Sequence, residues 1–193
     1  MTQLTERFEQ ALTYAFHLHD GQVRKGTQVP YFTHLIGVAS LVLEDGGDED
    51  EAIAALLHDA VEDQGGKKTL VEIKQRFGPR VARIVAACSD TDISPKPPWK
   101  LRKEQHLAEL EHAASDVLRV SLADKIHNVR NILYDYRSSG EVLWSRFRGG
   151  KDGTLWYYRS LVALFRRKRG DGLVEEFARV VTELEELSGG KAP

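Results

Sequence analysis

The sequence predicts an all-α fold, and three observations support this prediction. Apolar residues recur three and four positions apart in most segments, which is the spacing that places them on one face of a helix. No stretch of convincing length alternates apolar and polar residues as a β-strand does. Glycines and prolines stand between several of the periodic segments, where they would end helices.

The first helices can be read from the apolar pattern alone. Residues 8–16 and 35–43 each repeat apolar side chains at helical spacing, so we expect two amphipathic helices. The segment from Ala52 to Val61 is apolar almost all round before its polar end. It therefore predicts a central helix that its neighbours enclose.

Two further helices are predicted around a break at Gly78-Pro79. The first runs from Leu70 to Phe77, with Thr69 as its expected N-cap, and the second from Val81 to about Cys88. The following residues, 89–98, contain three prolines and are polar, so we expect a surface loop that lies over a pocket.

The second half of the chain predicts four helices, over residues 100–114, 117–136, 155–167 and 173–187. A looser glycine-containing segment through Gly153 separates the second helix from the third. There are no internal repeats and no dividing linker, so we expect one domain over residues 1–187 and a frayed tail over residues 188–193.

Composition excludes several classes of function. The chain of 193 residues has a formal net charge of −2 and a pI near 6.4, which give no general attraction to nucleic acid or to an acidic membrane. The basic run at residues 166–169 is interpreted as a solvated helix end. We therefore expect a small-molecule partner and no nucleic acid, while the oligomeric state cannot be predicted.

The cellular setting follows from the same composition. Cys88 is the single cysteine, so no intramolecular disulfide can form, and its apolar surroundings indicate a reduced core thiol. No apolar run approaches the ~18 residues that a membrane span needs. We expect a soluble, cytoplasmic protein.

The most informative segment is Leu56-Leu57-His58-Asp59-Ala60-Val61-Glu62-Asp63, which places one histidine and three carboxylates at the end of an apolar run. Such crowding is costly unless a cation lies among the carboxylates. The segment therefore predicts a metal ion held by some of these groups and a proton-transfer role for the others.

The remaining metal ligands must come from other elements, because adjacent helical residues point about 100° apart. His34 follows a Pro-Tyr-Phe-Thr turn, and Asp124 stands where an apolar stretch becomes polar. Together with His58 and Asp59 they would offer two imidazoles and two carboxylates. This mixed set suits a divalent ion such as Mn, Fe, Zn or Mg, and the lack of a thiolate argues against a structural zinc site.

The spacing of these residues resembles that of the HD-domain metal-dependent phosphohydrolases. The surrounding sequence is similar to one branch, the hydrolase domain of the Rel/Spo alarmone enzymes and the small stand-alone alarmone hydrolases. The resemblance covers about residues 5–165 and rests on four stretches: His19-Asp20-Gly21-Gln22-Val23-Arg24-Lys25, Pro30-Tyr31-Phe32-Thr33-His34, residues 54–63, and Leu122-Ala123-Asp124-Lys125-Ile126-His127-Asn128-Val129-Arg130. It implies an HD-domain helical bundle, Mn²⁺ as the ion, and removal of the 3′-pyrophosphate of (p)ppGpp to give GDP or GTP.

Glu62 and Asp63 are the predicted catalytic residues. Each lies about one helical turn beyond His58 and Asp59, close enough to address a metal-bound water. A carboxylate beside such a water can orient it and accept its proton. The resemblance assigns the same task to this pair.

The predicted substrate contacts are cations, an amide and an aromatic ring. The resemblance places Arg24 and Lys25 along the nucleotide and uses Asn128, one turn after Asp124, for a phosphate or ribose hydroxyl. Two lysines that flank or follow the proline-rich loop, Lys96 and Lys103, would close over the phosphates. Tyr157 falls near a substrate-contacting aromatic of the small hydrolases.

The sequence departs from the guanine-specific relatives in two places that bear on substrate choice, the segment over residues 89–99 and the stretch after Lys25. The usual Arg-Lys-Ser-Gly-Glu-Pro-Tyr stretch is one residue longer, as Arg24-Lys25-Gly26-Thr27-Gln28-Val29-Pro30-Tyr31. The base is therefore left open, and hydrolysis of an adenine alarmone, (p)ppApp, is one alternative. General HD-type nucleotide hydrolysis and a non-enzymatic alarmone sensor are the others, although the intact Glu62-Asp63 pair argues against a sensor.

Overall fold

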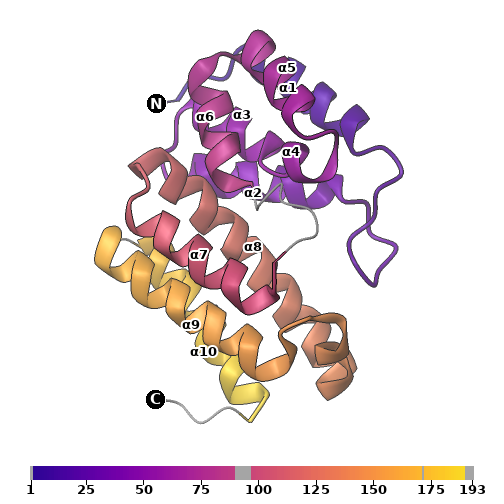
Figure 1. Ribbon diagram of the computed structural model, residues 1–193, viewed down its shortest axis with the longest axis vertical. Coiled ribbons are helices and arrows are strands. Elements are labelled where there is room, and N and C mark those ends of the chain that lie inside the picture. The colour runs from indigo at the N-terminus through magenta and orange to yellow at the C-terminus, as the bar shows by residue number, and fades with distance from the viewer. Residues whose placement is uncertain (1, 90–96, 171, 190–193) are drawn as a thin grey trace. The chain divides into compact units, whose positions relative to one another are not determined.

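The computed structural model describes residues 2–89, 97–170 and 172–189. Within these ranges the chain forms ten α-helices and one 3-10 helix and no β-strand (Figure 1). The one β-type pairing there is an isolated antiparallel bridge between Val23 and Pro30. The all-α prediction is confirmed.

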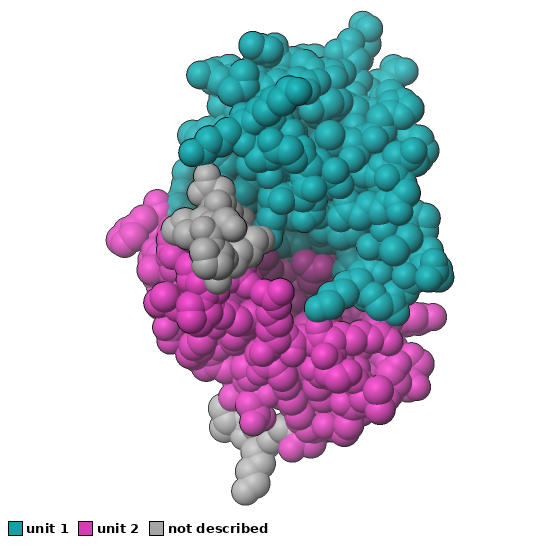
Figure 2. Space-filling view, turned by 45° about the vertical axis from the view of Figure 1, so that its right-hand side comes forward, with its two compact units in different colours: residues 1–96, 113–124 teal, residues 97–112, 125–193 magenta. Residues whose placement is uncertain are grey.

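The chain divides into two compact units, coloured separately in Figure 2. Unit 1 comprises residues 1–96 and 113–124, and unit 2 comprises residues 97–112 and 125–193. The expectation of one domain over residues 1–187 stays a prediction.

Unit 1 is built around a buried helix. Its helices are α1 (Glu6–Leu18), α2 (Phe32–Glu44), α3 (Glu49–Leu57), α4 (Ala60–Asp63), α5 (Lys67–Phe77), α6 (Pro79–Cys88) and the first part of α8 (Ser115–Ser139). Helix α3 packs against α1, α2 and α6, and every residue from Glu51 to Leu57 is buried. The prediction that neighbouring helices enclose this segment is therefore confirmed for residues 52–57.

The N-terminus of α3 is fixed by a capping box. The Asp48 carboxylate accepts from the backbone N–H of Glu51 at 3.0 Å, and the Glu51 carboxylate accepts from the backbone N–H of Asp48 at 2.8 Å. Arg119 of α8 pairs with Glu51 and, at 2.9 Å, with Asp45. Because these bonds set where α3 begins, they also set the position of the residues that follow its last turn.

Two local predictions in unit 1 were wrong. The helix predicted over residues 52–61 is interrupted, since α3 ends at Leu57 and α4 begins at Ala60. Thr69 is not an N-cap, because α5 begins two residues earlier at Lys67 with Gly66 as its N-cap. Gly66 has a φ of 61°, which a glycine adopts without strain, and the Thr69 hydroxyl instead donates to the Gln64 carbonyl.

Unit 2 contains α7 (Trp99–Glu111), the rest of α8, the 3-10 helix η1 (Gly140–Arg146), α9 (Gly150–Lys168) and α10 (Gly172–Leu187). Helix α9 packs against α7 and α10. The last helix buries one apolar side that includes Val174, Phe177, Val181 and Leu184.

Helix boundaries in unit 2 differ from the predicted ones. Helix α7 ends at Glu111, and α9 begins at Gly150, five residues before the predicted start. The glycines in its first turn have a packing role, because a Cβ at Gly149 would lie 2.7 Å from the Trp99 ring and one at Gly153 would lie 3.1 Å from it. None of the helices in the described part of the chain is long and apolar enough to cross a membrane.

Candidate metal centre

His58 stands at the junction of α3 and α4, in a form suited to bind a cation. Its side chain is 2% exposed, and Nδ1 donates to the backbone carbonyl of Ala55 at 2.8 Å. Because a backbone carbonyl only accepts, this bond places a proton on Nδ1 and leaves Nε2 as the nitrogen that can bind a cation. Among the described residues, no group makes a well-directed hydrogen bond to that buried Nε2.

The four predicted ligands lie together, and all four belong to unit 1. His58 Nε2 lies 3.0 Å from Asp59 Oδ2 and 3.6 Å from Asp124 Oδ1. His34 Nε2, from α2, lies 3.2 Å from Asp124 Oδ1 and 3.6 Å from Asp59 Oδ2. Ligand atoms of His34, His58 and Asp59 all fall within 4.8 Å of one another. Residues far apart in the sequence are thus brought to one point.

The electrostatics of this cluster favour a cation at its centre. Burial by itself lowers the pKa of His58, but Asp59 and Asp124 hold that pKa well above its ordinary value. Burial by itself raises the pKa of Asp59, but His58 and His34 hold it well below the ordinary value. Two nitrogens and two carboxylates in this arrangement fit a borderline divalent ion, which would take the place of the proton.

Tyr31 is a site residue to which the sequence analysis gave no role. Its hydroxyl donates to Asp59 Oδ2 at 2.6 Å, and its ring stacks on that of His19 with centroids 5.5 Å apart. Burial and the nearby Asp59 raise the pKa of the Tyr31 hydroxyl, so it stays a donor. Tyr31 lies three residues before His34, but no pattern in the sequence marks its contact with Asp59.

Glu62 and Asp63 end α4, one turn after the proposed ligands. The Asp63 carboxylate accepts from Gln22 Nε2 at 2.8 Å. Partial desolvation raises the pKa of Asp63, the Gln22 hydrogen bond lowers it, and the charges of Asp59 and Glu62 raise it again, so that the net shift is upward. A carboxyl group with a raised pKa is better suited to accept a proton.

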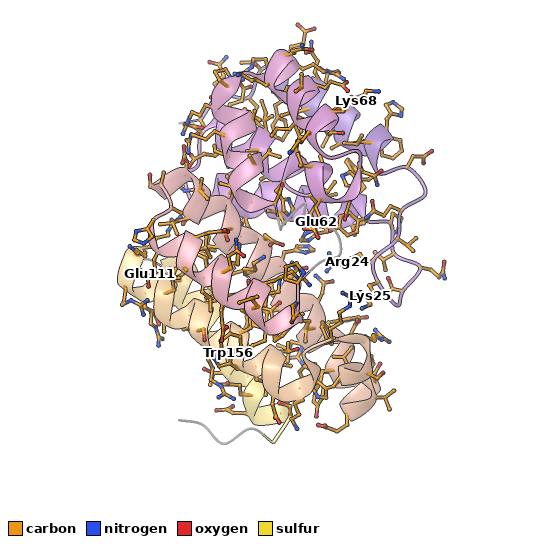
Figure 3. All side chains as sticks on the ribbon, in the orientation of Figure 1. Arg24, Lys25, Glu62, Lys68, Glu111 and Trp156 are labelled. Atoms are coloured by element: carbon orange, nitrogen blue, oxygen red, sulfur yellow. The ribbon has the colours of Figure 1, made fainter. Side chains whose placement is uncertain are left out.

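Arg24 and Lys25 lie in the loop before α2. Two backbone hydrogen bonds connect the ends of this loop. The Arg24 N–H donates to the Val29 carbonyl at 2.9 Å, and the Tyr31 N–H donates to the Gln22 carbonyl at 2.8 Å. Figure 3 labels Glu62 on α4 and both cations on this loop, and all three residues belong to unit 1. The residue that lengthens this loop is accommodated in a turn with Gly26 at a φ of 77°.

The other predicted substrate contacts are Asn128 on α8, Lys103 on α7 and Tyr157 on α9, and all three belong to unit 2. Tyr157 is buried, with Lys103 Nζ 5.1 Å from its ring centroid and the Trp99 ring at 6.3 Å. Lys96 lies outside the described residues. These assignments stay predictions.

Comparisons with known proteins agree with this chemistry. The model of the HD domain family matches residues 11–154. The chain is 37% identical over 126 residues to the mouse protein named guanosine-3′,5′-bis(diphosphate) 3′-pyrophosphohydrolase MESH1, a match that covers 64% of this chain and 68% of that protein. It is 36% identical over 133 residues to the Aquifex aeolicus guanosine-3′,5′-bis(diphosphate) 3′-pyrophosphohydrolase, covering 67% of this chain and 18% of that longer protein.

Solved structures show a similar fold. A structure of a metazoan ortholog of SpoT, described as hydrolysing ppGpp and playing a role in starvation responses, matches with a TM-score of 0.74 and 25% identity over 99% of this chain and all of that one. The crystal structure of lmo0812 from Listeria monocytogenes matches with a TM-score of 0.69 and 28% identity, covering 79% of this chain and 99% of that one.

Proposed function

This chain belongs to the HD domain family and, within it, to the branch of the MESH1 pyrophosphohydrolases, and from this premise we propose that it is a metal-dependent hydrolase that removes the 3′-pyrophosphate of (p)ppGpp. The observation that carries the proposal is the convergence of His34, His58, Asp59 and Asp124 within unit 1, beside the Glu62-Asp63 pair.

His34, His58, Asp59 and Asp124 would hold the ion, for which we propose Mn²⁺. When bound, such an ion lowers the pKa of a coordinated water and polarises the phosphoryl oxygens. The hydrogen bonds from His58 Nδ1 to the Ala55 carbonyl and from the Tyr31 hydroxyl to Asp59 orient two of these ligands.

Glu62 and Asp63 would orient the attacking water and accept its proton. Water adds to the phosphorus next to the ribose, the bond from that phosphorus to the 3′-oxygen breaks, and the 3′-oxygen leaves with a proton. The products are pyrophosphate and GDP or GTP.

Arg24 and Lys25 would offset the negative charge that spreads over the phosphoryl oxygens in the transition state. Asn128, Lys96, Lys103 and Tyr157 complete the proposed substrate contacts. The proposal also places the protein in the cytoplasm, where nucleotide substrates are available.

The experiment that tests this function is a substrate panel. Metal-free protein is loaded with Mn²⁺ and given ppGpp, ppApp, a deoxynucleoside monophosphate and a cyclic nucleotide, and the products are separated by anion exchange. Pyrophosphate release from ppGpp that EDTA abolishes is expected. Pyrophosphate release from ppApp alone would change the proposed substrate to an adenine alarmone. Release of free phosphate would indicate a general nucleotidase. Binding of ppGpp without turnover would indicate a sensor.

A further inference from the structure

Gln22 has no role in the function proposed above, yet its side chain makes three hydrogen bonds. Its Nε2 donates to Asp63 Oδ2 at 2.8 Å. Its Oε1 lies 2.7 Å from Gln64 Nε2 and 2.7 Å from His19 Nδ1. Both the donor and the acceptor of this half-buried amide are therefore engaged within the protein.

The chemistry of the three partners fixes which way the amide points. A carboxylate only accepts hydrogen bonds, so the Gln22 atom beside Asp63 must be the nitrogen. An amide nitrogen only donates, so the Gln22 atom beside Gln64 Nε2 must be the oxygen. The Gln22 N–H must therefore face Asp63, and its carbonyl oxygen must face Gln64 and His19. His19 is then protonated at Nδ1.

The Gln22 backbone is held as firmly as its side chain. Its N–H donates to the His19 carbonyl at 3.1 Å, and its carbonyl accepts from the Tyr31 N–H at 2.8 Å. His19 is itself 3% exposed and stacks on Tyr31. A buried ring and two backbone bonds thus support the amide that contacts Asp63.

We infer that Gln22 is a positioning residue, which holds the Asp63 carboxylate in the direction required for proton transfer. The inference rests on the function proposed for Asp63. His19 and Gln64 act through Gln22 by fixing its amide. The side-chain hydrogen bonds of Gln22 go to Asp63, Gln64 and His19 and to none of the four proposed metal ligands, so its effect is on catalysis and not on metal binding.

The first test is a double-mutant cycle in the Mn²⁺-loaded, full-length protein. Gln22→Met removes the donor with little change in size, and Asp63→Ala removes the group it holds. With ppGpp, Gln22→Met is expected to lower kcat about 10- to 100-fold, since loss of orientation costs this much, and to leave KM within about threefold. In the Asp63→Ala background it should lower kcat less than twofold further.

Two variants serve as controls. Gln10 donates to Glu6 on the exposed face of α1 at 3.2 Å, so Gln10→Met should leave both kinetic constants unchanged. Gln22→Glu keeps the oxygen that faces His19 and replaces only the donor, so it should lower kcat at least as much as Gln22→Met. The Mn²⁺ affinity of Gln22→Met, measured by calorimetry, should stay within about threefold of wild type.

A readout independent of turnover separates this inference from the proposed function. The Gln22 side-chain amide signals in a nitrogen–proton NMR spectrum are assigned by their loss in Gln22→Met. They should move in Asp63→Ala, because the carboxylate acceptor is gone. The inference would be overturned if the Gln22 amide signals did not move in Asp63→Ala. It would also be overturned if the losses of kcat in the two single variants were additive, or if Gln22→Met changed KM alone. If wild-type protein released no pyrophosphate, the proposed function would fail, and the NMR comparison would still decide the contact.

Discussion

The imidazole of His58 is prepared for metal binding by its own backbone. Its Nδ1 proton is engaged by the Ala55 carbonyl one turn earlier, so Nε2 faces the carboxylates of Asp59 and Asp124. Tyr31 does the same for Asp59 by donating to one carboxylate oxygen. Partners of this kind set ligand orientation and basicity, so they contribute to metal affinity without touching the ion.

Replacing Tyr31 by phenylalanine tests that contribution. Tyr31→Phe removes one hydroxyl and keeps the ring that stacks on His19. We expect Mn²⁺ affinity to fall about tenfold or more, as it does when outer-shell partners are lost. Calorimetric titration of the metal-free protein measures this, with Tyr134→Phe on an exposed ring as the control. Equal Mn²⁺ affinity in Tyr31→Phe and wild type would contradict the role.

A variant of Glu62 can show whether this side chain acts in proton transfer and not in metal binding. Glu62→Gln keeps the size of the side chain and removes its ability to accept a proton. We expect kcat for pyrophosphate release to fall about 100-fold or more, with Mn²⁺ affinity within about threefold of wild type. Steady-state kinetics with saturating Mn²⁺ provides the measurement. An unchanged kcat would remove Glu62 from the proposed mechanism.

At the scale of the element, apolar periodicity predicted where helices lie but not where they stop. The pattern over residues 52–61 predicts one helix, yet the helix is interrupted at His58 and Asp59. Their side chains are directed to partners on α2 and α8, and such long-range contacts override local propensity. The early start of α9 has a similar cause, because the Trp99 ring fills the space beside Gly149 and Gly153.

The Arg119 contacts anchor α3 and can be tested by unfolding. Glu51 is 3% exposed, so Arg119→Leu would leave a buried carboxylate without its cation. We expect a loss of about 3 kcal/mol in the free energy of unfolding, measured by urea denaturation of metal-free protein. Arg179→Leu is the matched control, since its pair with Glu176 on α10 is exposed and should contribute less than about 0.5 kcal/mol. Equal losses in the two variants would contradict the account.

Arg80 makes a pH-dependent contribution to the start of α3. Partial burial raises the pKa of Asp48, but the hydrogen bond and charge of Arg80 hold it below the ordinary 3.8. At Asp116, Arg83 lowers the pKa against the effect of burial, and a hydrogen bond from Arg80 adds to this. On acidification the unfolded chain therefore takes up protons before the folded one, so this contribution is complete above about pH 4 and is lost as the pH falls further. Between pH 5 and pH 3, Arg80→Met should lose less unfolding free energy than wild type in urea titrations. Parallel pH profiles would contradict this.

At the scale of the whole molecule, the sequence predicted which four side chains converge better than it predicted their surroundings. His34, His58, Asp59 and Asp124 belong to recognisable stretches, and a mixed nitrogen and oxygen set has few uses other than metal binding. The hydrogen bonds of Tyr31 and Gln22 depend on how the loop before α2 folds back on unit 1. No periodicity or spacing encodes such side-chain geometry, so these two residues could be assigned only from the structure.

The central claim is that four side chains of unit 1 hold one divalent ion. Crystals grown with Mn²⁺ and measured at a wavelength where manganese scatters anomalously would locate the ion directly. The account predicts one strong peak bonded to Nε2 of His34, Nε2 of His58 and a carboxylate oxygen from each of Asp59 and Asp124. A peak bonded to other residues, or no peak in this cluster at saturating Mn²⁺, would contradict it.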